Sequence, residues 1–194
     1  MPASKQELLK DTNGECSLNP NKYTPVIEVV SPGSSSFTRL KKEMYISDDY
    51  EAELRDLAKQ KKPVVLAVEA GGRYVGRVTL RHDWGDETPI IEKDFPGLPQ
   101  INALEIDEDY RRRGLATMLI AAAENEARRQ GFPMIGLGVE ISNEPAKRLY
   151  EKLGYSYQQV GGSDTYDFLF GKPKPQVYKL RLMTKSLRTG VNHD

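Results

Sequence analysis

The strongest constraint in this sequence is a strand that passes through a short turn into a long apolar helix. "QINALEID" (100–107) alternates apolar and polar residues, which is typical of a half-buried strand. "EDYRRRG" (108–114) follows, and residues 115–130 then repeat apolar side chains at helical spacing until Gly131 ends the helix. The expected stripe comprises Leu115, Ala116, Met118, Leu119, Ile120, Ala122, Ala123 and Ala127, and the polar remainder comprises Glu124, Glu126, Arg128 and Arg129.

The start of this helix is suited to binding an anion. A helix start has unpaired N–H groups and a partial positive charge. Gly114 removes a side chain where a phosphate would approach the backbone, Ala116 is small, and Thr117 adds a hydroxyl. We therefore expect a pyrophosphate held mainly by backbone amides, with charge from Arg111–Arg113 at its rim. Two alternatives for the arginines are a solvated run and a nucleic-acid patch.

The remaining segments predict a mixed α/β sheet with helices on its faces. Further strands are expected at 24–30, 64–68, 74–80, 134–141, 155–160 and 176–183, with Gly71-Gly72 as a hairpin turn. Residues 36–60 predict two helices, the second starting at Ser47 or Asp48, and Asn143 is expected to cap another that ends at Gly154. Residues 82–99 and 161–175 are expected to be irregular connections.

Composition excludes several classes of function. Lys plus Arg and Asp plus Glu each number 28, and a net charge of zero disfavours a general nucleic-acid binder. Cys16 is the single cysteine, and His82 and His193 are far apart, so no metal site is expected. No apolar run has membrane-spanning length, and the N-terminus lacks the apolar core of a signal peptide. These features predict a soluble, cytoplasmic protein without a membrane partner.

Two segments resemble those of a known family. "RRRGLA" (111–116) matches the Arg/Gln-x-x-Gly-x-Gly/Ala signature of the GNAT superfamily of acyl-CoA-dependent N-acetyltransferases, and "LEIDEDY" precedes it as in that family. "GLGVEISNEPAKRLYEKLGY" (136–155) is similar to the family's second segment. The resemblance implies a GNAT domain over 23–184, between a flexible extension (1–22) and a tail (185–194). It also implies a mostly antiparallel central sheet, helices on both faces, and splayed fourth and fifth strands.

The resemblance implies acetyl-CoA as the cosubstrate. Its pantetheine arm would pair, like an extra strand, with Leu104, Glu105 and Ile106. Asn143 and Ala146 lie where the family contacts the CoA arm. The pyrophosphate would lie on the backbone amides of Arg112, Arg113, Gly114, Leu115, Ala116 and Thr117, beside Arg111.

The implied reaction is direct attack of a neutral primary amine on the thioester carbonyl. Tyr150 matches the family tyrosine that protonates the departing thiolate, although a core aromatic would have the same spacing. The backbone N–H of Glu105 or Ile106 would polarise the carbonyl oxygen. Gln100 stands where many members have a glutamate base, and an amide cannot act as one. Glu105 is the first candidate to replace it, beside a water relay and the carboxylates Asp83, Asp86, Glu87 and Glu140.

The acceptor is the least constrained part of this prediction. Aromatic residues in the two irregular segments could form an acceptor pocket or pack in an ordinary core: Trp84, Tyr166, Phe168 and Phe170. A small-molecule amine is slightly favoured over a protein amine. The alternative function is a GNAT-fold module that binds acyl-CoA without catalysis, as a sensor or partner, and a homodimer is common in the family.

Overall fold

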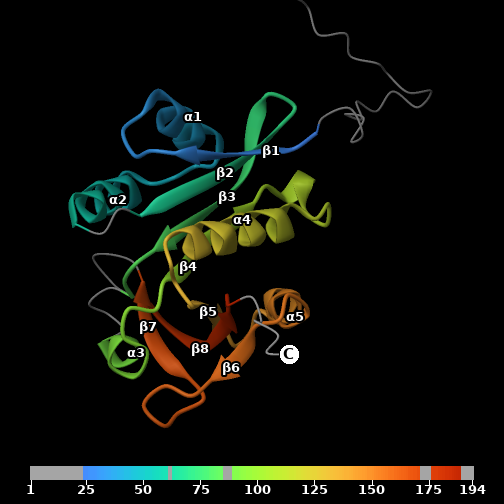
Figure 1. Cartoon of the computed structure of the whole chain (residues 1–194). Helices are drawn as coiled ribbons and strands as arrows, with labels where there is room; N and C mark the ends of the chain where they lie inside the picture. Colours follow the sequence, from blue (N-terminus) through green and yellow to red (C-terminus); the bar gives the residue numbers. More distant parts are fainter. Residues whose placement is uncertain (1–23, 61–62, 85–88, 171–175, 189–194) are drawn as a thin grey trace, which may run out of the picture.

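The computed structural model describes residues 24–60, 63–84, 89–170 and 176–188 (Figure 1). The expected extension at 1–22 and the candidates Asp86 and Glu87 lie outside these ranges. The strands are β1 (Val26–Val30), β2 (Val64–Ala70), β3 (Arg73–Arg81), β4 (Gln100–Ile106), β5 (Met134–Glu140), β6 (Ser156–Gln158), β7 (Tyr166–Phe170) and β8 (Gln176–Ser186). The helices are α1 (Ser35–Glu43), α2 (Asp48–Gln60), α3 (Pro89–Asp94), the 3-10 turn η1 (Glu108–Tyr110), α4 (Leu115–Arg129) and α5 (Glu144–Lys152).

All of these strands belong to one sheet with the order β1-β2-β3-β4-β5-β8-β6, and β7 also pairs with β8. Each pairing is antiparallel except that between β4 and β5, which is parallel. The hairpin turn at Gly71-Gly72 is confirmed, with φ values of 67° and 81°. The sheet is therefore the mixed, mostly antiparallel sheet that the resemblance implied.

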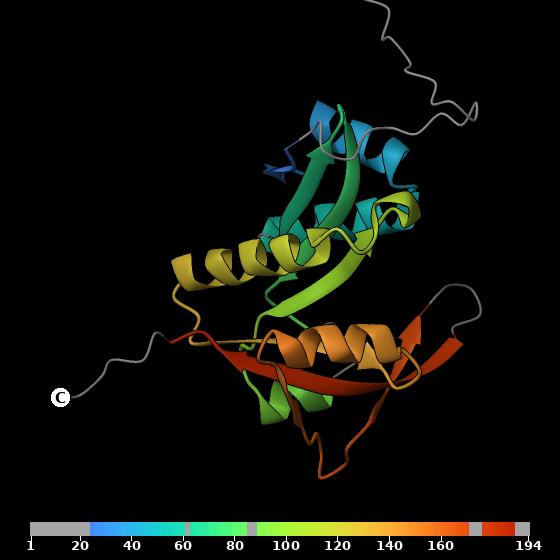
Figure 2. The ribbon, with the colours of Figure 1, turned by 90° about the vertical axis from the view of Figure 1, so that its right-hand side faces the viewer.

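Helices cover both faces of the N-terminal half of the sheet because side chains alternate along its strands. On β2, Val65 and Ala67 pack with Phe37 and Leu54 of the α1–α2 side. Residues of β2 on the opposite face, among them Leu66, pack in the cluster that contains the buried stripe of α4. Figure 2 shows α4 (yellow) over the N-terminal half of the sheet and α5 (orange) over the C-terminal half.

The structure confirms the predicted helix over 115–130 but corrects its polarity. Glu124 was placed on the polar face, yet it is buried, with an exposed fraction of 5%. Met118 was placed on the apolar stripe, yet it is 37% exposed. Glu124 is buried because partners from other elements surround its carboxylate, and a helical period cannot show those partners.

Two segments expected to be irregular are ordered. Residues 89–94 form α3, whose six residues are too few for a helical period to be recognised. Residues 166–170 form β7, which depends on antiparallel pairing with β8. β8 extends to Ser186, two residues past the predicted domain end at 184. No helix within the described ranges is long and apolar enough to span a membrane.

The parallel strands β4 and β5 separate soon after they meet. They pair at Gln100 with Gly136 and at Ile101 with Leu137, and at no later position in the described chain. Ala103 then has a positive φ of 50°. The register on the other side of β4 shifts at the same point, since Thr79 faces Asn102 but Arg77 faces Glu105. This β-bulge bends β4 away from β5 and opens the splay that the resemblance implied.

Candidate active site

The turn before α4 exposes a row of unpaired backbone amides. Arg112 and Gly114 both have left-handed φ values, 63° and 80°. The Arg111 amide donates to the Glu108 carbonyl at 3.2 Å, and the Met118 amide donates to the Gly114 carbonyl at 3.1 Å. Within the described chain, the six amides between them, 112–117, have no hydrogen-bond acceptor outside the helix, whose first turn provides none. This is the arrangement that binds a phosphate at a helix start.

Two of the three arginines, Arg111 and Arg113, form hydrogen bonds that stabilise this turn. Arg111 Nε donates to the Ile106 carbonyl at 3.2 Å, and its Nη1 lies 3.1 Å from Glu108. Arg113 Nη2 donates to the Asp109 carbonyl at 2.8 Å. Arg112 is exposed and makes no ion pair with any residue that the structure describes. Arg112 is therefore the arginine whose charge is available at the rim.

A cavity of about 330 Å³ occupies the opening between β4 and β5. Its lining combines side chains that the sequence singled out with others that it did not. The first group comprises Trp84, Gln100, Leu104, Tyr150, Tyr166 and Phe168, and the second comprises Ile101, Asn102, Ala103, Gly138, Tyr178 and Leu180. The side chain of Phe170 lies outside the described part of the chain.

Tyr150 of α5 lines this cavity and packs in the hydrophobic cluster on the face of the sheet that α4 covers. It is 8% exposed, and burial raises the pKa of its hydroxyl from 10.0 to about 12. Its ring meets the edge of the Tyr155 ring with centroids 6.0 Å apart. No residue in the described chain forms a hydrogen bond with its hydroxyl. The hydroxyl therefore stays protonated at neutral pH and is available to a bound molecule.

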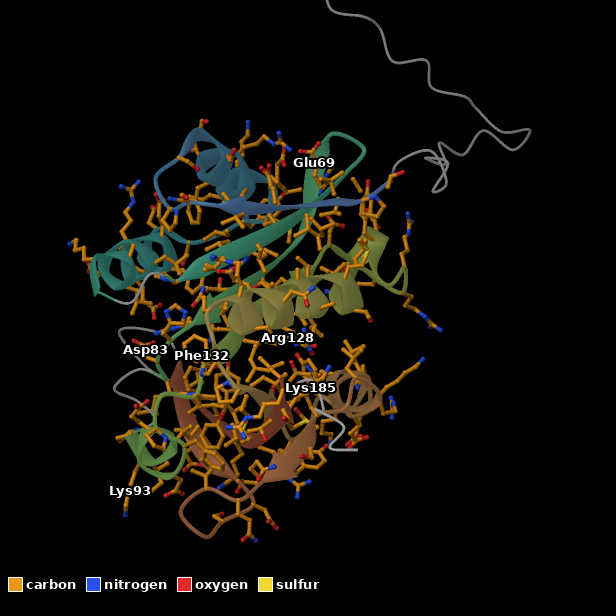
Figure 3. All side chains as sticks on the ribbon, viewed as in Figure 1. Glu69, Asp83, Lys93, Arg128, Phe132 and Lys185 are labelled. Carbon is orange, nitrogen blue, oxygen red and sulfur yellow. The ribbon has the colours of Figure 1, made fainter. Side chains whose placement is uncertain are left out.

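The buried carboxylate of Glu124 stabilises the position of Tyr155, whose ring contacts that of Tyr150. The Tyr155 hydroxyl donates to Glu124 Oε1 at 3.1 Å, and Lys185 Nζ lies 2.8 Å from both oxygens of the same carboxylate. Burial, and then the charge of Glu124, raise the pKa of the Tyr155 hydroxyl. Figure 3 labels Lys185 together with Arg128, which also contacts Glu124 at 3.4 Å. This network connects α4 to β8.

Glu105, the first candidate base, does not line the cavity. Its carboxylate lies 2.9 Å from Nη2 and 3.2 Å from Nε of Arg77, on the neighbouring strand β3. The Arg77 guanidinium in turn lies over the ring of Tyr50, 4.9 Å from its centroid. Leu104 does line the cavity, and the edge of β4 that faces β5 has no strand partner beyond Ile101 in the described ranges. That edge can accept an extended ligand by β-strand addition.

Among the described residues, the candidate bases Asp83 and Glu140 do not line the cavity either. Asp83 lies 3.0 Å from Arg81, and Glu140 accepts a hydrogen bond from the Ser142 hydroxyl at 2.7 Å. Gln100, by contrast, is buried and lines the cavity. The described part of the lining thus contains no carboxylate.

Asn143 caps α5, as the sequence predicted. Its side-chain oxygen accepts a hydrogen bond from the Ala146 amide at 3.1 Å. Both residues lie at the start of the helix that contains Tyr150, so a contact with a CoA arm is compatible with capping and stays a prediction. Among the residues that the structure describes, no group of three or more His, Cys, Asp or Glu side chains could hold a metal ion.

Comparison with known proteins agrees with this geometry. A protein described as an N-acetyltransferase from Methanocaldococcus jannaschii is 30% identical over 104 residues, which cover 54% of this chain and 44% of that protein. An N-alpha-acetyltransferase from Sulfurisphaera tokodaii is 29% identical over 118 residues, covering 56% of this chain and 69% of that protein. The chain thus spans less than half the length of the first of these relatives.

A solved structure has the same fold. The GNAT family acetyltransferase from Elizabethkingia anophelis, which has acetyl-CoA bound, has a TM-score of 0.56 and 14% sequence identity, covering 84% of this chain and 97% of that one. The model of the Acetyltransferase (GNAT) family matches residues 34–155, which is more than half of the 194 residues and includes both signature segments. The chain therefore belongs to the GNAT acetyltransferase family.

Proposed function

We propose that this protein transfers an acetyl group from acetyl-CoA to a primary amine of a small molecule by direct attack. The observation that supports this most is the early end of the β4–β5 pairing. It opens a cavity that Tyr150 lines, and a free edge of β4 leads from there toward the unpaired amides before α4.

The chain offers a separate contact for each part of acetyl-CoA. The six amides 112–117 would hold the pyrophosphate, with Arg112 as the rim charge. The backbone of Leu104, Glu105 and Ile106 would pair with the pantetheine arm along the free edge of β4. Asn143 and Ala146 would contact the arm from the start of α5. These donors match an extended anionic ligand, and none of them requires a metal.

The chemistry uses groups at the splay. Acetyl-CoA supplies the acetyl group as an activated thioester. The Tyr150 hydroxyl would hold the proton that the sulfur leaving group needs, and burial keeps that hydroxyl protonated. The backbone N–H of Glu105 or Ile106 would polarise the carbonyl oxygen. A water relay would remove the proton from the amine. Glu105 is a weaker candidate for this base than a water relay, because its carboxylate already forms an ion pair with Arg77.

A panel of amines tests this proposal. The purified protein is incubated with acetyl-CoA and single amines, namely alkylamines, arylalkylamines, diamines, amino acids and short peptides. Release of free thiol and the mass of the product are then measured. We expect stoichiometric thiol and N-acetylated product with at least one small amine. If acetyl-CoA raises the melting temperature but no amine is acetylated, the chain is instead the non-catalytic acyl-CoA binder, which Gln100 in the cavity would explain.

A further inference from the structure

The residues that line the cavity between β4 and β5 come from both faces of the sheet. Tyr150 belongs to the hydrophobic cluster that packs against α4. Trp84 and Tyr166, which also line the cavity, belong to a separate cluster that packs against α3. Figure 1 shows α4 and α3 on different parts of the molecule, with β7 and β8 beside α3. The α4 side contains the proposed CoA contacts, so the acceptor would enter from the α3 side.

On the α3 side the cavity is bounded mainly by aromatic rings. β7 and β8 pair with Phe168 opposite Tyr178 and with Tyr166 opposite Leu180. Alternate residues of a strand share a face, so all four of these side chains lie on the same face of the two strands. Trp84, which follows β3, adds a fourth ring. Aromatic rings arranged in this way favour a flat apolar ligand by stacking and edge contacts.

Hydrogen bonds and close packing hold three of these rings in place. Trp84 Nε1 donates to the Leu98 carbonyl at 2.9 Å. The Tyr178 hydroxyl donates to the Gln176 side chain at 2.7 Å. Tyr166 lies so close to Gly138 that a Cβ at this glycine would overlap its hydroxyl oxygen. Such walls lose little conformational freedom when a ligand binds, which favours affinity.

We infer that the acceptor is a small amine with an aromatic body, bound against Trp84, Tyr166, Phe168 and Tyr178. This inference rests on the proposed acetyl transfer at the same cavity. The whole cavity has a volume of about 330 Å³, at the small end of ligand pockets, and the acetyl end of the cofactor would occupy part of it, so a single ring on a short linker suits the rest. The described lining contains no Asp, Glu, Lys or Arg. The second ammonium of a diamine would lose its hydration there without gaining a counter-charge from these described lining residues.

The same environment assists the chemistry. Removal from water lowers the pKa of an amine because burial disfavours the charged form. An arylalkylamine whose ring is held by the aromatic side chains would therefore place its nitrogen in a medium that favours the neutral nucleophile. Gln100 and Asn102 line the same cavity, and their side-chain amides are uncharged hydrogen-bonding groups.

The single tryptophan makes binding directly measurable. Trp84 is the only tryptophan of the chain, so its emission reports occupation of the acceptor side. With CoA present, the full-length protein is titrated with 2-phenylethylamine, hexylamine, 1,4-diaminobutane and a tripeptide with an N-terminal alanine. We expect 2-phenylethylamine to change the Trp84 emission and to bind at least about tenfold tighter than the diamine and the tripeptide.

Phe168 separates an aromatic pocket from a merely apolar one. Phe168→Ala should weaken 2-phenylethylamine binding about tenfold. Phe168→Leu, which keeps apolar volume without a ring, should weaken 2-phenylethylamine more than hexylamine. Leu169→Ala is the matched control, because Leu169 is the next residue of β7, is 40% exposed and does not line the cavity. It should leave both affinities unchanged.

Several results would overturn the inference, and they differ from failure of the proposed function. Preference for the diamine or the tripeptide would overturn it, and so would equal binding of 2-phenylethylamine to the wild type and to both Phe168 variants. Acetylation of other amines would leave acetyl transfer standing in that case. If 2-phenylethylamine binds with the expected dependence on Phe168 but is never acetylated, the aromatic site stands and the transferase proposal fails.

Discussion

Substitution of Gly114 provides a quantitative test of the proposed pyrophosphate site. Gly114 has a φ of 80°, and a Cβ built there meets no atom within 4 Å. The Cβ of either alanine or glutamate therefore fits at this position, and both residues share the same backbone cost, about 1–2 kcal/mol for an L-residue in the left-handed region. For a chain of 194 residues this lowers the melting temperature by about 2–8 °C in both variants. Both variants should fold.

The two variants differ in charge beside the proposed phosphate. A carboxylate about 5 Å from one phosphate charge, at an effective dielectric constant of about 20, adds about 3 kcal/mol of repulsion. Since each 1.4 kcal/mol is about a factor of ten, Gly114→Glu should bind CoA more than about a hundredfold more weakly than Gly114→Ala. The repulsion is screened by salt, so the ratio should shrink as ionic strength rises from about 0.1 M to about 1 M.

Isothermal titration of CoA into both variants measures this ratio, and thermal unfolding checks that both are folded. Dephospho-CoA is a useful second ligand because it keeps the pyrophosphate and lacks the distant ribose phosphate. Equal affinities of the alanine and glutamate variants for CoA would refute the placement of the pyrophosphate at 112–117. A large difference that does not depend on salt would show that the effect is not electrostatic.

Three further substitutions test other parts of the site. Tyr150→Phe should lower turnover about a hundredfold with unchanged CoA affinity and an unchanged shape of the pH–rate profile from about pH 6 to 10. Because burial raises the pKa of the Tyr150 hydroxyl from 10.0 to about 12, its proton contributes to stability fully below pH 10.0, and this contribution is lost as the pH rises through about 12. Gly138→Ala should displace the Tyr166 hydroxyl. We expect a lower melting temperature and a higher KM for the acceptor. Glu124→Ala removes the carboxylate that accepts hydrogen bonds from Tyr155 and Lys185, and it should lower the free energy of unfolding by about 2–3 kcal/mol. This is less than for a fully buried pair because the Lys185 side chain is 23% exposed. An unchanged denaturant midpoint would contradict this expectation.

The sequence predicted those parts of the protein that depend on local chemistry. The start of α4 at Gly114, the cap of α5 at Asn143 and the turn at Gly71-Gly72 follow from backbone preferences of single residues. The splay of β4 and β5 was expected from the resemblance, because both signature segments are short and continuous in sequence. Tyr150 was identified in the same way, and the structure places it at the cavity.

Side chains whose environment depends on distant partners were not predicted correctly from sequence alone. A helical period assigned Glu124 to solvent, because it cannot show that Tyr155 and Lys185 approach from other elements. Glu105 was suggested as a base, but the strand register places it against Arg77. Sequence patterns report only neighbours along the chain, whereas ion pairs across a sheet depend on register.

The sequence by itself therefore determined the family, the sheet type and the glycine start of α4 with its unpaired amides, since each depends on short continuous segments. Only the tertiary structure decided the aromatic side of the cavity. β7 forms by pairing with β8, and that pairing brings Phe168 against Tyr178 and places Tyr166 beside Gly138 of β5. These contacts join residues that are separated along the chain, and they form only when the strands pair in one register, which no local pattern specifies.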